Sequence, residues 1–212
     1  MARQGNNIFE PFTGKVGSIV GTTWRGTAVL RSAPQKSDKK PSAAQLLQRL
    51  KFRMLMEFLH PIKPFLAARF GKMEGSKSPF DLALSYHLKE ALKIEDETPQ
   101  INYVKVCISK GHLRGVEGAT AKVHSENLLQ VQWRDNSAQS FASPDDMLTI
   151  ALFVPSIASF YFFENIALRQ DKTTELTLPD NAIGVEMHAW ATFVSFTGSQ
   201  AATSSYILVA KA

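Results

Sequence analysis

The sequence predicts an α+β protein in which a glycine-rich β-ribbon and about three helices precede an all-β sandwich. Two observations predict this class. Apolar residues recur at helical spacing between residues 43 and 92, whereas short alternating runs separated by turn residues follow from residue 101. We therefore expect two domains, a ribbon and helical region over residues 1–98 and a sandwich over residues 99–212.

The first predicted element is an extended ribbon over residues 14–31. With a side-chain period of two, its even positions form an apolar face, and Lys15, Arg25 and Arg31 lie on the opposite face. Four glycines within thirteen residues would weaken an isolated ribbon, so we expect bulges, a tight turn or close approach of another chain. The predicted apolar face consists of Val16, Val20, Trp24, Ala28 and Leu30.

Helices are predicted after a polar connector over residues 32–40. Ser42 and Gln45 have the spacing of a capping box, and apolar residues at helical spacing then continue as far as Leu59, before Pro61. A second, short helical piece over residues 65–70 is closed by Gly71.

A third helix is predicted to begin after Ser78. This residue is a favourable N-cap, Pro79 suits the first helical position, and Asp81 lies near the positive end of the helix dipole. Acidic residues and Pro99 then end the helical region, which places the domain boundary near Thr98.

Eight strands are predicted beyond residue 101, with turn residues between them. Four of them, near residues 127–133, 147–154, 176–180 and 185–190, resemble strands B, C, E and F of fibronectin type III domains. This resemblance implies an immunoglobulin/fibronectin III-like sandwich, although the tyrosine expected near the start of strand F is absent. The predicted strands are residues 102–109, 119–124, 128–134, 147–154, 160–164, 175–178, 184–196 and 204–211.

A second resemblance covers essentially the whole chain. The opening residues 1–4, the glycine-rich run from Gly14 to Gly26 and the helix over residues 45–58 are similar to an uncharacterised protein family from Bacteroidota. The resemblance implies a bacterial or bacteriophage-type setting and assigns no activity.

No catalytic or metal-binding pattern is present in the sequence. The chain lacks Gly-x-Ser-x-Gly and the phosphate-binding loop pattern, its five histidines are scattered singly, and Cys107 is its only cysteine. The acidic pair at residues 145–146 is explained as a turn before a strand. We therefore expect no enzyme activity, metal or cofactor. We also expect cytoplasmic synthesis, since neither a signal peptide nor an apolar membrane span is apparent.

The charge is distributed unevenly along a chain whose net charge is +5. Residues 1–80 contain 14 Lys or Arg and 4 Asp or Glu, whereas residues 81–212 contain 10 and 15. Such asymmetry favours an anionic partner, either nucleic acid or the acidic surface of a protein subunit, and a solvated helix face explains it equally well. Trp24 is expected to be a packing anchor within this basic region.

The aromatic run over residues 160–163 allows two interpretations. Four consecutive aromatic residues of a strand cannot all face one core, so two point outward and form an exposed protein interface, unless Leu55 and Phe58 of the first helix cover them. Both interpretations remain open at this level.

The preferred hypothesis is a non-enzymatic structural or assembly protein that contacts copies of itself or other subunits, either on its own or within a larger particle. The alternative is a nucleic-acid-binding protein that uses the basic N-terminal half. The candidate interaction residues are Lys15, Trp24, Arg25, Arg31, Lys39, Lys40, Arg49, Arg53, Phe160, Tyr161, Phe162 and Phe163.

Overall fold

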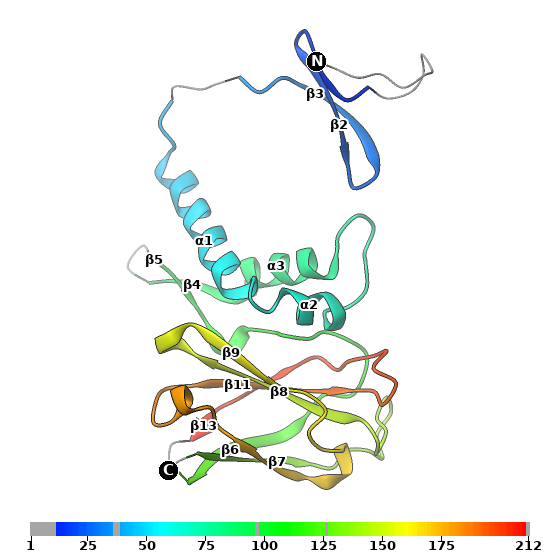
Figure 1. Cartoon of the computed structure of the whole chain (residues 1–212), viewed down its shortest axis with the longest axis vertical. Helices are drawn as coiled ribbons and strands as arrows, with labels where there is room; N and C mark the ends of the chain where they lie inside the picture. The colour runs from blue at the N-terminus through cyan, green and yellow to red at the C-terminus, as the bar shows by residue number, and fades with distance from the viewer. Residues whose placement is uncertain (1–11, 36–38, 96–97, 126, 211–212) are drawn as a thin grey trace. The chain divides into compact units, whose positions relative to one another are not determined.

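The computed structural model describes residues 12–35, 39–95, 98–125 and 127–210. The chain forms two compact units, Met1–Ser42 and Ala43–Ala212 (Figure 1). The sequence placed the division near Thr98, but the structure places it after Ser42, because the helices share a hydrophobic core with one face of the sandwich. The α+β class is confirmed, with the helices and the sandwich strands in one unit.

The N-terminal unit contains a three-stranded antiparallel sheet rather than one continuous ribbon. Its strands are β1 (Gly14–Val16), β2 (Ile19–Trp24) and β3 (Thr27–Ser32), in that spatial order. Two-residue turns join them, and positive φ angles at Gly17 (58°) and at Arg25 and Gly26 (50° and 81°) match the turns that suit the right-handed twist of paired strands.

The strand register overturns the predicted apolar face. Lys15 pairs with Val20, which pairs with Arg31, so these three side chains share one face of the sheet. Val16 pairs with Ile19 and lies on the other face. Each two-residue turn exchanges even and odd positions between neighbouring strands, so a period-two pattern read straight through the turns mixes the two faces.

Gly21 is the one buried residue among residues 12–35. A Cβ atom at this position would lie 2.1 Å from the carbonyl oxygen of Phe12. The expected close backbone approach at a glycine therefore occurs within the chain, in the middle of the sheet.

Three helices follow at the predicted places: α1 (Ala43–Leu59), α2 (Lys63–Arg69) and α3 (Pro79–Glu90). The cap of α3 is confirmed in detail. The Ser78 hydroxyl oxygen accepts a hydrogen bond from the Asp81 amide at 3.3 Å, and the Asp81 carboxylate accepts one from the Ser78 amide at 2.8 Å.

The sandwich consists of two four-stranded sheets, in the orders β10-β7-β6-β13 and β12-β11-β8-β9. The strands predicted as B, C, E and F are β7, β8, β10 and β11. B lies beside E and C beside F, as in immunoglobulin-type sandwiches. The strand bounds are β6 (Glu117–Ser125), β7 (Leu128–Arg134), β8 (Met147–Val154), β9 (Ser159–Phe163), β10 (Thr173–Thr177), β11 (His188–Val194), β12 (Ser205–Ile207) and β13 (Val209–Ala210).

Two local predictions between the helices and the sandwich are wrong. A hairpin of β4 (Leu92–Glu95) and β5 (Thr98–Ile101) occupies the predicted domain boundary. Residues 102–109 do not form the expected strand. The Ile108 amide donates a hydrogen bond to the Ser204 hydroxyl, and the Ser204 amide donates one to the Ser109 carbonyl, instead of the regular pairing of a sheet. Their apolar pattern reflects burial beneath the helices rather than sheet pairing.

The central strands β8 and β11 are buried on both faces. Leu148, Ile150 and Leu152 of β8 face the other sheet, whereas Phe153 and the fully buried Trp190 face the helices. Figure 1 shows the resulting layers, with the helices against one face of the sheet that contains β8 and β11 and the second sheet against its opposite face. This double burial joins helices and sandwich into one unit.

The aromatic run of β9 is covered by helices, which decides between the two predicted interpretations in favour of coverage rather than an exposed interface. Phe160 packs on Phe58 of α1 with ring centroids 5.1 Å apart, and Phe162 packs on Phe65 of α2 at 4.6 Å. Tyr161 and Phe163 point to the opposite side and pack against the sandwich core. All four side chains are half-buried.

A buried ion pair closes one end of the sandwich. Arg169 is fully buried, and its Nε and Nη2 atoms donate to Asp146 Oδ2 at 3.1 and 2.9 Å. The same guanidinium donates to Asn136 and to the Arg114 carbonyl, and it stacks on Phe193 at 3.9 Å. The pair at residues 145–146 is therefore more than a turn, because Asp146 neutralises a buried cation.

We expect the substitution Arg169→Met to lower the free energy of unfolding by roughly 3–5 kcal/mol, because it leaves the Asp146 carboxylate buried without its cation. Urea unfolding of the full chain measures this loss. The substitution Lys122→Met is the matched control, since Lys122 is exposed on β6, and it should change stability by less than about 0.5 kcal/mol. Equal effects of the two substitutions would contradict the expectation.

Candidate interaction surface and apolar pocket

The N-terminal sheet exposes apolar side chains on both faces. Val16, Ile19 and Leu30 share one face and are 55%, 47% and 61% exposed. Trp24 on the other face is 55% exposed, and the Arg25 guanidinium lies 4.9 Å from its ring centroid. Trp24 is thus not the buried packing anchor that the sequence suggested.

This sheet has no hydrophobic core of its own among the described residues. Both core clusters of the described chain consist of residues beyond residue 57. A three-stranded sheet needs an apolar face packed against something to be stable. The exposed apolar residues make this sheet a candidate interaction surface.

The predicted interaction residues are distributed over both units. Lys15, Trp24, Arg25 and Arg31 lie in the sheet, and Lys39 and Lys40 in the segment before α1. Two further cations project from the exposed side of α1, where Arg53 lies 4.0 Å from Glu57. The candidate residues on the N-terminal half are Lys15, Trp24, Arg25, Arg31, Lys39, Lys40, Arg49 and Arg53, and those on β9 are Phe160, Tyr161, Phe162 and Phe163.

The net charge belongs to the N-terminal unit. Residues 1–42 contain seven Lys or Arg and two Asp or Glu, a balance of +5, whereas residues 43–212 contain 17 of each. The asymmetry deduced from the sequence is therefore concentrated in the unit whose described residues contribute to neither core cluster.

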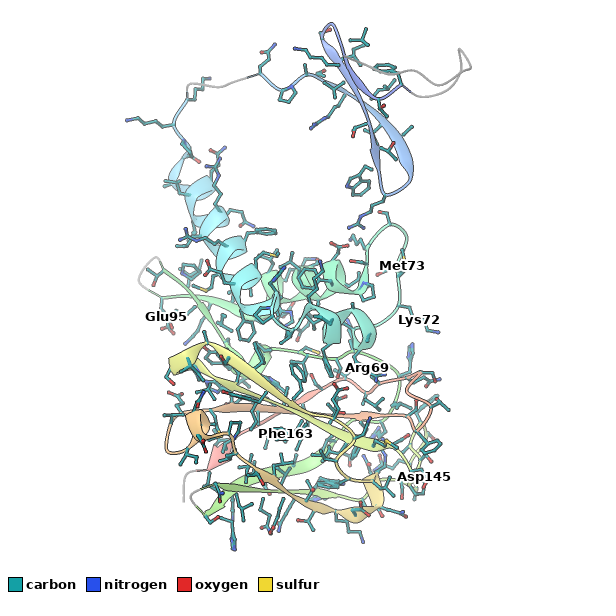
Figure 2. The ribbon with its side chains drawn as sticks, in the orientation of Figure 1. Arg69, Lys72, Met73, Glu95, Asp145 and Phe163 are labelled. Atoms are coloured by element: carbon teal, nitrogen blue, oxygen red, sulfur yellow. The ribbon has the colours of Figure 1, made fainter. Side chains whose placement is uncertain are left out.

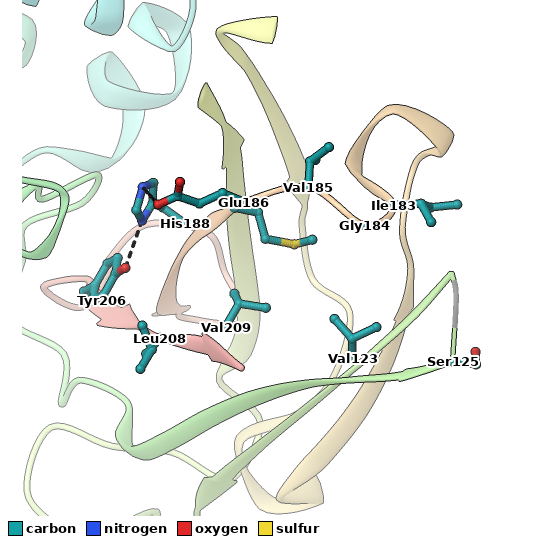
Figure 3. A pocket seen from close by; sticks show the side chains of 11 residues that line it. Val123, Ser125, Ile183, Gly184, Val185, Glu186, His188, Tyr206, Leu208 and Val209 are labelled. Atoms are coloured by element: carbon teal, nitrogen blue, oxygen red, sulfur yellow. Dashed lines mark hydrogen bonds and ion pairs between the residues drawn. The ribbon is translucent and has the colours of Figure 1, made fainter. Parts of the chain in front are cut away.

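An apolar pocket of about 630 Å³ opens at one end of the sandwich (Figure 3). Its lining comes from the end of β6, the segment before β11 and the last strands, and includes Val123, Ile183 and Val209. The final strand causes the opening. β12 pairs with β11 in one sheet, β13 pairs with β6 in the other, and Leu208 between them is 74% exposed.

His188, Tyr206 and Glu186 lie together at one end of this pocket (Figure 3). His188 Nδ1 and the Tyr206 hydroxyl share a hydrogen bond of 2.9 Å, and Nε2 lies 3.7 Å from the Glu186 carboxylate. The carboxylate favours the tautomer with the proton on Nε2, in which the Tyr206 hydroxyl donates to Nδ1. The His188 ring also stacks on Tyr103 at 3.8 Å.

The electrostatics of this end follow from burial. Burial lowers the pKa of His188, and the nearby Glu186 carboxylate opposes that shift. Burial and the same carboxylate raise the pKa values of Tyr103 and Tyr206.

His188 Nε2 is the single buried side-chain nitrogen or oxygen in the described chain without a hydrogen-bond partner. The pocket is suited to holding an apolar group beside a hydrogen-bond donor.

A second buried histidine has a structural role. His87 is fully buried on α3, where Nδ1 donates to the Ala83 carbonyl at 2.7 Å and Nε2 accepts from the Cys107 amide at 3.2 Å. Burial lowers the pKa of His87. Both ring nitrogens are used in the neutral form, so a proton has no acceptor there.

Two further features relevant to function are clusters of metal ligands and membrane-spanning helices. No group of three or more potential metal ligands occurs among residues 12–35, 39–95, 98–125 and 127–210. Within those ranges no helix is long and apolar enough to cross a bilayer. No local sequence pattern marks the pocket, because its walls come from three separated segments within residues 123–125, 183–188 and 206–209.

Comparisons with known proteins identify a family and weak structural likenesses. The model of a family described as "Family of unknown function (DUF6266)" matches residues 11–208. None of the curated proteins matches the chain.

Two solved structures show a weak and partial likeness. The FN1–FN3 domains of chicken CNTN1 are 13% identical with a TM-score of 0.32, over 47% of this chain and 30% of that one. A chain titled "Myokine structure" is 14% identical with a TM-score of 0.31, over 45% of this chain and 95% of that one. These similarities are too low to support any statement about function.

We expect stability to fall as the pH drops below about 6.5. The pKa values of His87 and His188 are lowered from 6.5 in the folded chain, so the unfolded chain binds more protons below that pH. The stabilisation is present above 6.5 and is lost as the pH falls toward the folded pKa values. Urea unfolding at several pH values between 7.5 and 5 measures the slope, in a range above that of ordinary carboxylates.

The substitution His188→Gln should reduce this slope, and His60→Gln should leave it unchanged, because His60 is exposed on the described surface. A free energy of unfolding that stays constant over this pH range would contradict the expected neutral state of both buried rings.

Proposed function

The chain belongs to the family of unknown function DUF6266, and we propose that it is a non-enzymatic structural protein that acts through protein–protein contacts. In this proposal the N-terminal sheet docks onto another subunit, in the simplest case a second copy of this chain. The setting is a bacterial or bacteriophage-type multisubunit assembly.

The observation that carries the proposal is the sheet without a core. Covering a large apolar side chain contributes about 1.5–3 kcal/mol, so burying the exposed half of Val16, Ile19 and Leu30 on one face contributes roughly 2–5 kcal/mol. Their exposed fractions lie between 47% and 61%. A partner that covers one face also supplies the packing that a three-stranded sheet needs.

The chemistry of the pocket also favours binding over catalysis. His188 is committed to Tyr206 and stacked on Tyr103. The remaining polar side chains of the lining are those of Glu186 and Ser125, and Ser125 lies at the opposite end of the pocket from His188 (Figure 3). The hydroxyl beside His188 is that of Tyr206, whose pKa is raised by burial and by the Glu186 carboxylate. A raised pKa disfavours its ionisation to a nucleophile, which supports a non-enzymatic role.

We expect the full chain to associate at micromolar concentrations and the double substitution Ile19→Lys and Leu30→Lys to abolish that association, because it places two charges on the apolar face. Size-exclusion chromatography with light scattering measures both. The single substitution Thr27→Lys is a control, since Thr27 is exposed and pairs with Trp24 on the other face. A wild-type chain that remains monomeric at high micromolar concentration would contradict the proposal.

The concentration of charge in residues 1–42 favours a second candidate function, nucleic-acid binding. A +5 unit beside an electroneutral one attracts phosphate groups and releases counterions. Changing Arg25, Arg31, Lys39 and Lys40 to Gln should weaken oligonucleotide binding and reduce the dependence of log K on log salt by about 3–4 units. The absence of any mobility shift at low salt would exclude this candidate.

A further inference from the structure

A basic groove lies within the second unit, between the helices and the sandwich loops. Two adjoining hollows of about 550 and 200 Å³ share Gly71, Lys72, Lys110, Gly111 and His112 in their lining. Lys72 and Met73 lie on the loop between α2 and α3, and Arg69 ends α2 (Figure 2). Segments far apart in the sequence therefore meet at one concave surface.

Cations dominate this groove. Arg69, Lys72, Lys77 and Lys110 line it together with His112, and Glu74 is its one acidic residue. None of these four cations is ion-paired within the described chain. Because residues 43–212 are electroneutral as a whole, this local excess of positive charge is compensated elsewhere on the unit rather than in the groove.

The backbone that carries these side chains is firmly held. The Lys110 amide donates to the Arg69 carbonyl at 3.0 Å, and the Gly71 amide donates to the Lys110 carbonyl at 2.7 Å. Gly111 packs closely on the segment between β11 and β12. A Cβ atom at position 111 would lie 2.0 Å from the Ala201 carbonyl oxygen. The Lys110 ammonium lies 5.8 Å from the Tyr86 ring centroid. The backbone at Arg69, Gly71 and Lys110 is thus held in place, and Lys72 and Lys77 project from the exposed turn that follows it.

Backbone donors are available in the same place. The amides of Lys72, Met73, Gly111 and His112 have no hydrogen-bond acceptor in the part of the chain that the structure describes. All four residues line the larger hollow. Unpaired amides beside ammonium groups in a concave surface form the kind of environment that binds anionic oxygens.

We propose that this groove binds phosphate groups. Phosphate presents several strong acceptor oxygens on one centre and matches a site built from ammonium groups, a guanidinium and backbone amides. The groups come either from a free polyphosphate compound or from a nucleic-acid backbone, and the chemistry of the site is the same for both. The site does not rest on the N-terminal sheet and is independent of its proposed docking role.

Isothermal titration of the full chain with inorganic triphosphate, and with a single-stranded DNA of about 20 nucleotides at low salt, tests the groove and separates the two sources. The triple substitution Lys72→Gln, Lys77→Gln and Lys110→Gln should weaken binding by about tenfold or more, because charge-assisted hydrogen bonds are lost. Arg69 is retained, since its guanidinium donates to the Gly198 carbonyl.

The matched control is the triple substitution Lys89→Gln, Lys105→Gln and Lys122→Gln, which removes the same charge from exposed positions outside the groove. Binding should then remain within about twofold of wild type. Replacing the three groove lysines by arginine should preserve binding, and thermal unfolding verifies that each variant is folded.

Triphosphate binding that the groove substitutions abolish supports a free phosphate compound, and DNA binding alone, lost in the same variant, supports a nucleic-acid backbone. The proposal is overturned if neither probe binds at low salt, or if the groove and control variants lose affinity equally. Equally tight binding of polyglutamate would also overturn it, since the groove would then recognise negative charge in general.

Discussion

The burial of β8 and β11 on both faces is the constraint on which the rest of the second unit depends. One face of this strand pair packs against the other sheet, and the opposite face, with Phe153 and Trp190, packs against the helices. The helices cannot be separated from the sandwich without exposing both side chains. The basic groove exists for the same reason, because it lies where α2 ends against the loops of that sandwich.

Features that depend on neighbouring residues could be predicted from the sequence. The N-cap of α3 at Ser78 and the bounds of β8 follow from local chemistry and from periodicity. The register of the N-terminal sheet could not be read in this way, since it depends on turns at Gly17 and at Arg25 that exchange the faces.

Features that depend on distant segments were mostly missed. Whether Phe160 and Phe162 are exposed depends on where α1 and α2 pack, so the sequence could state the alternatives without choosing between them. The sequence predicts only a turn at Asp146, because its partner Arg169 lies 23 positions away and no local pattern connects the two residues. The groove and the pocket were missed for the same reason, since each is assembled from several separated segments.

The two units divide stability and charge between them. The second unit contains both core clusters and a balanced charge, whereas the N-terminal unit contributes the net charge and has one buried residue in its described part. In the docking that we propose, contact with a partner would bury the apolar surface that this sheet leaves exposed in its described part. Neutralising the cations of one unit therefore leaves the other intact, so anion binding by the sheet and by the groove are separable.

The pocket at the end of the sandwich illustrates how a strand exchange creates a binding surface. When the last strand leaves β11 at Ile207 and joins β6 at Val209, neither sheet is continued across the gap, and the core residues beneath are left accessible. His188 lies at this opening with Nε2 unpaired. A buried donor without a partner destabilises the folded chain by about 1–3 kcal/mol. The exposed Glu186 carboxylate lies 3.7 Å from Nε2, so a small movement of that side chain would supply the missing hydrogen bond and recover this free energy.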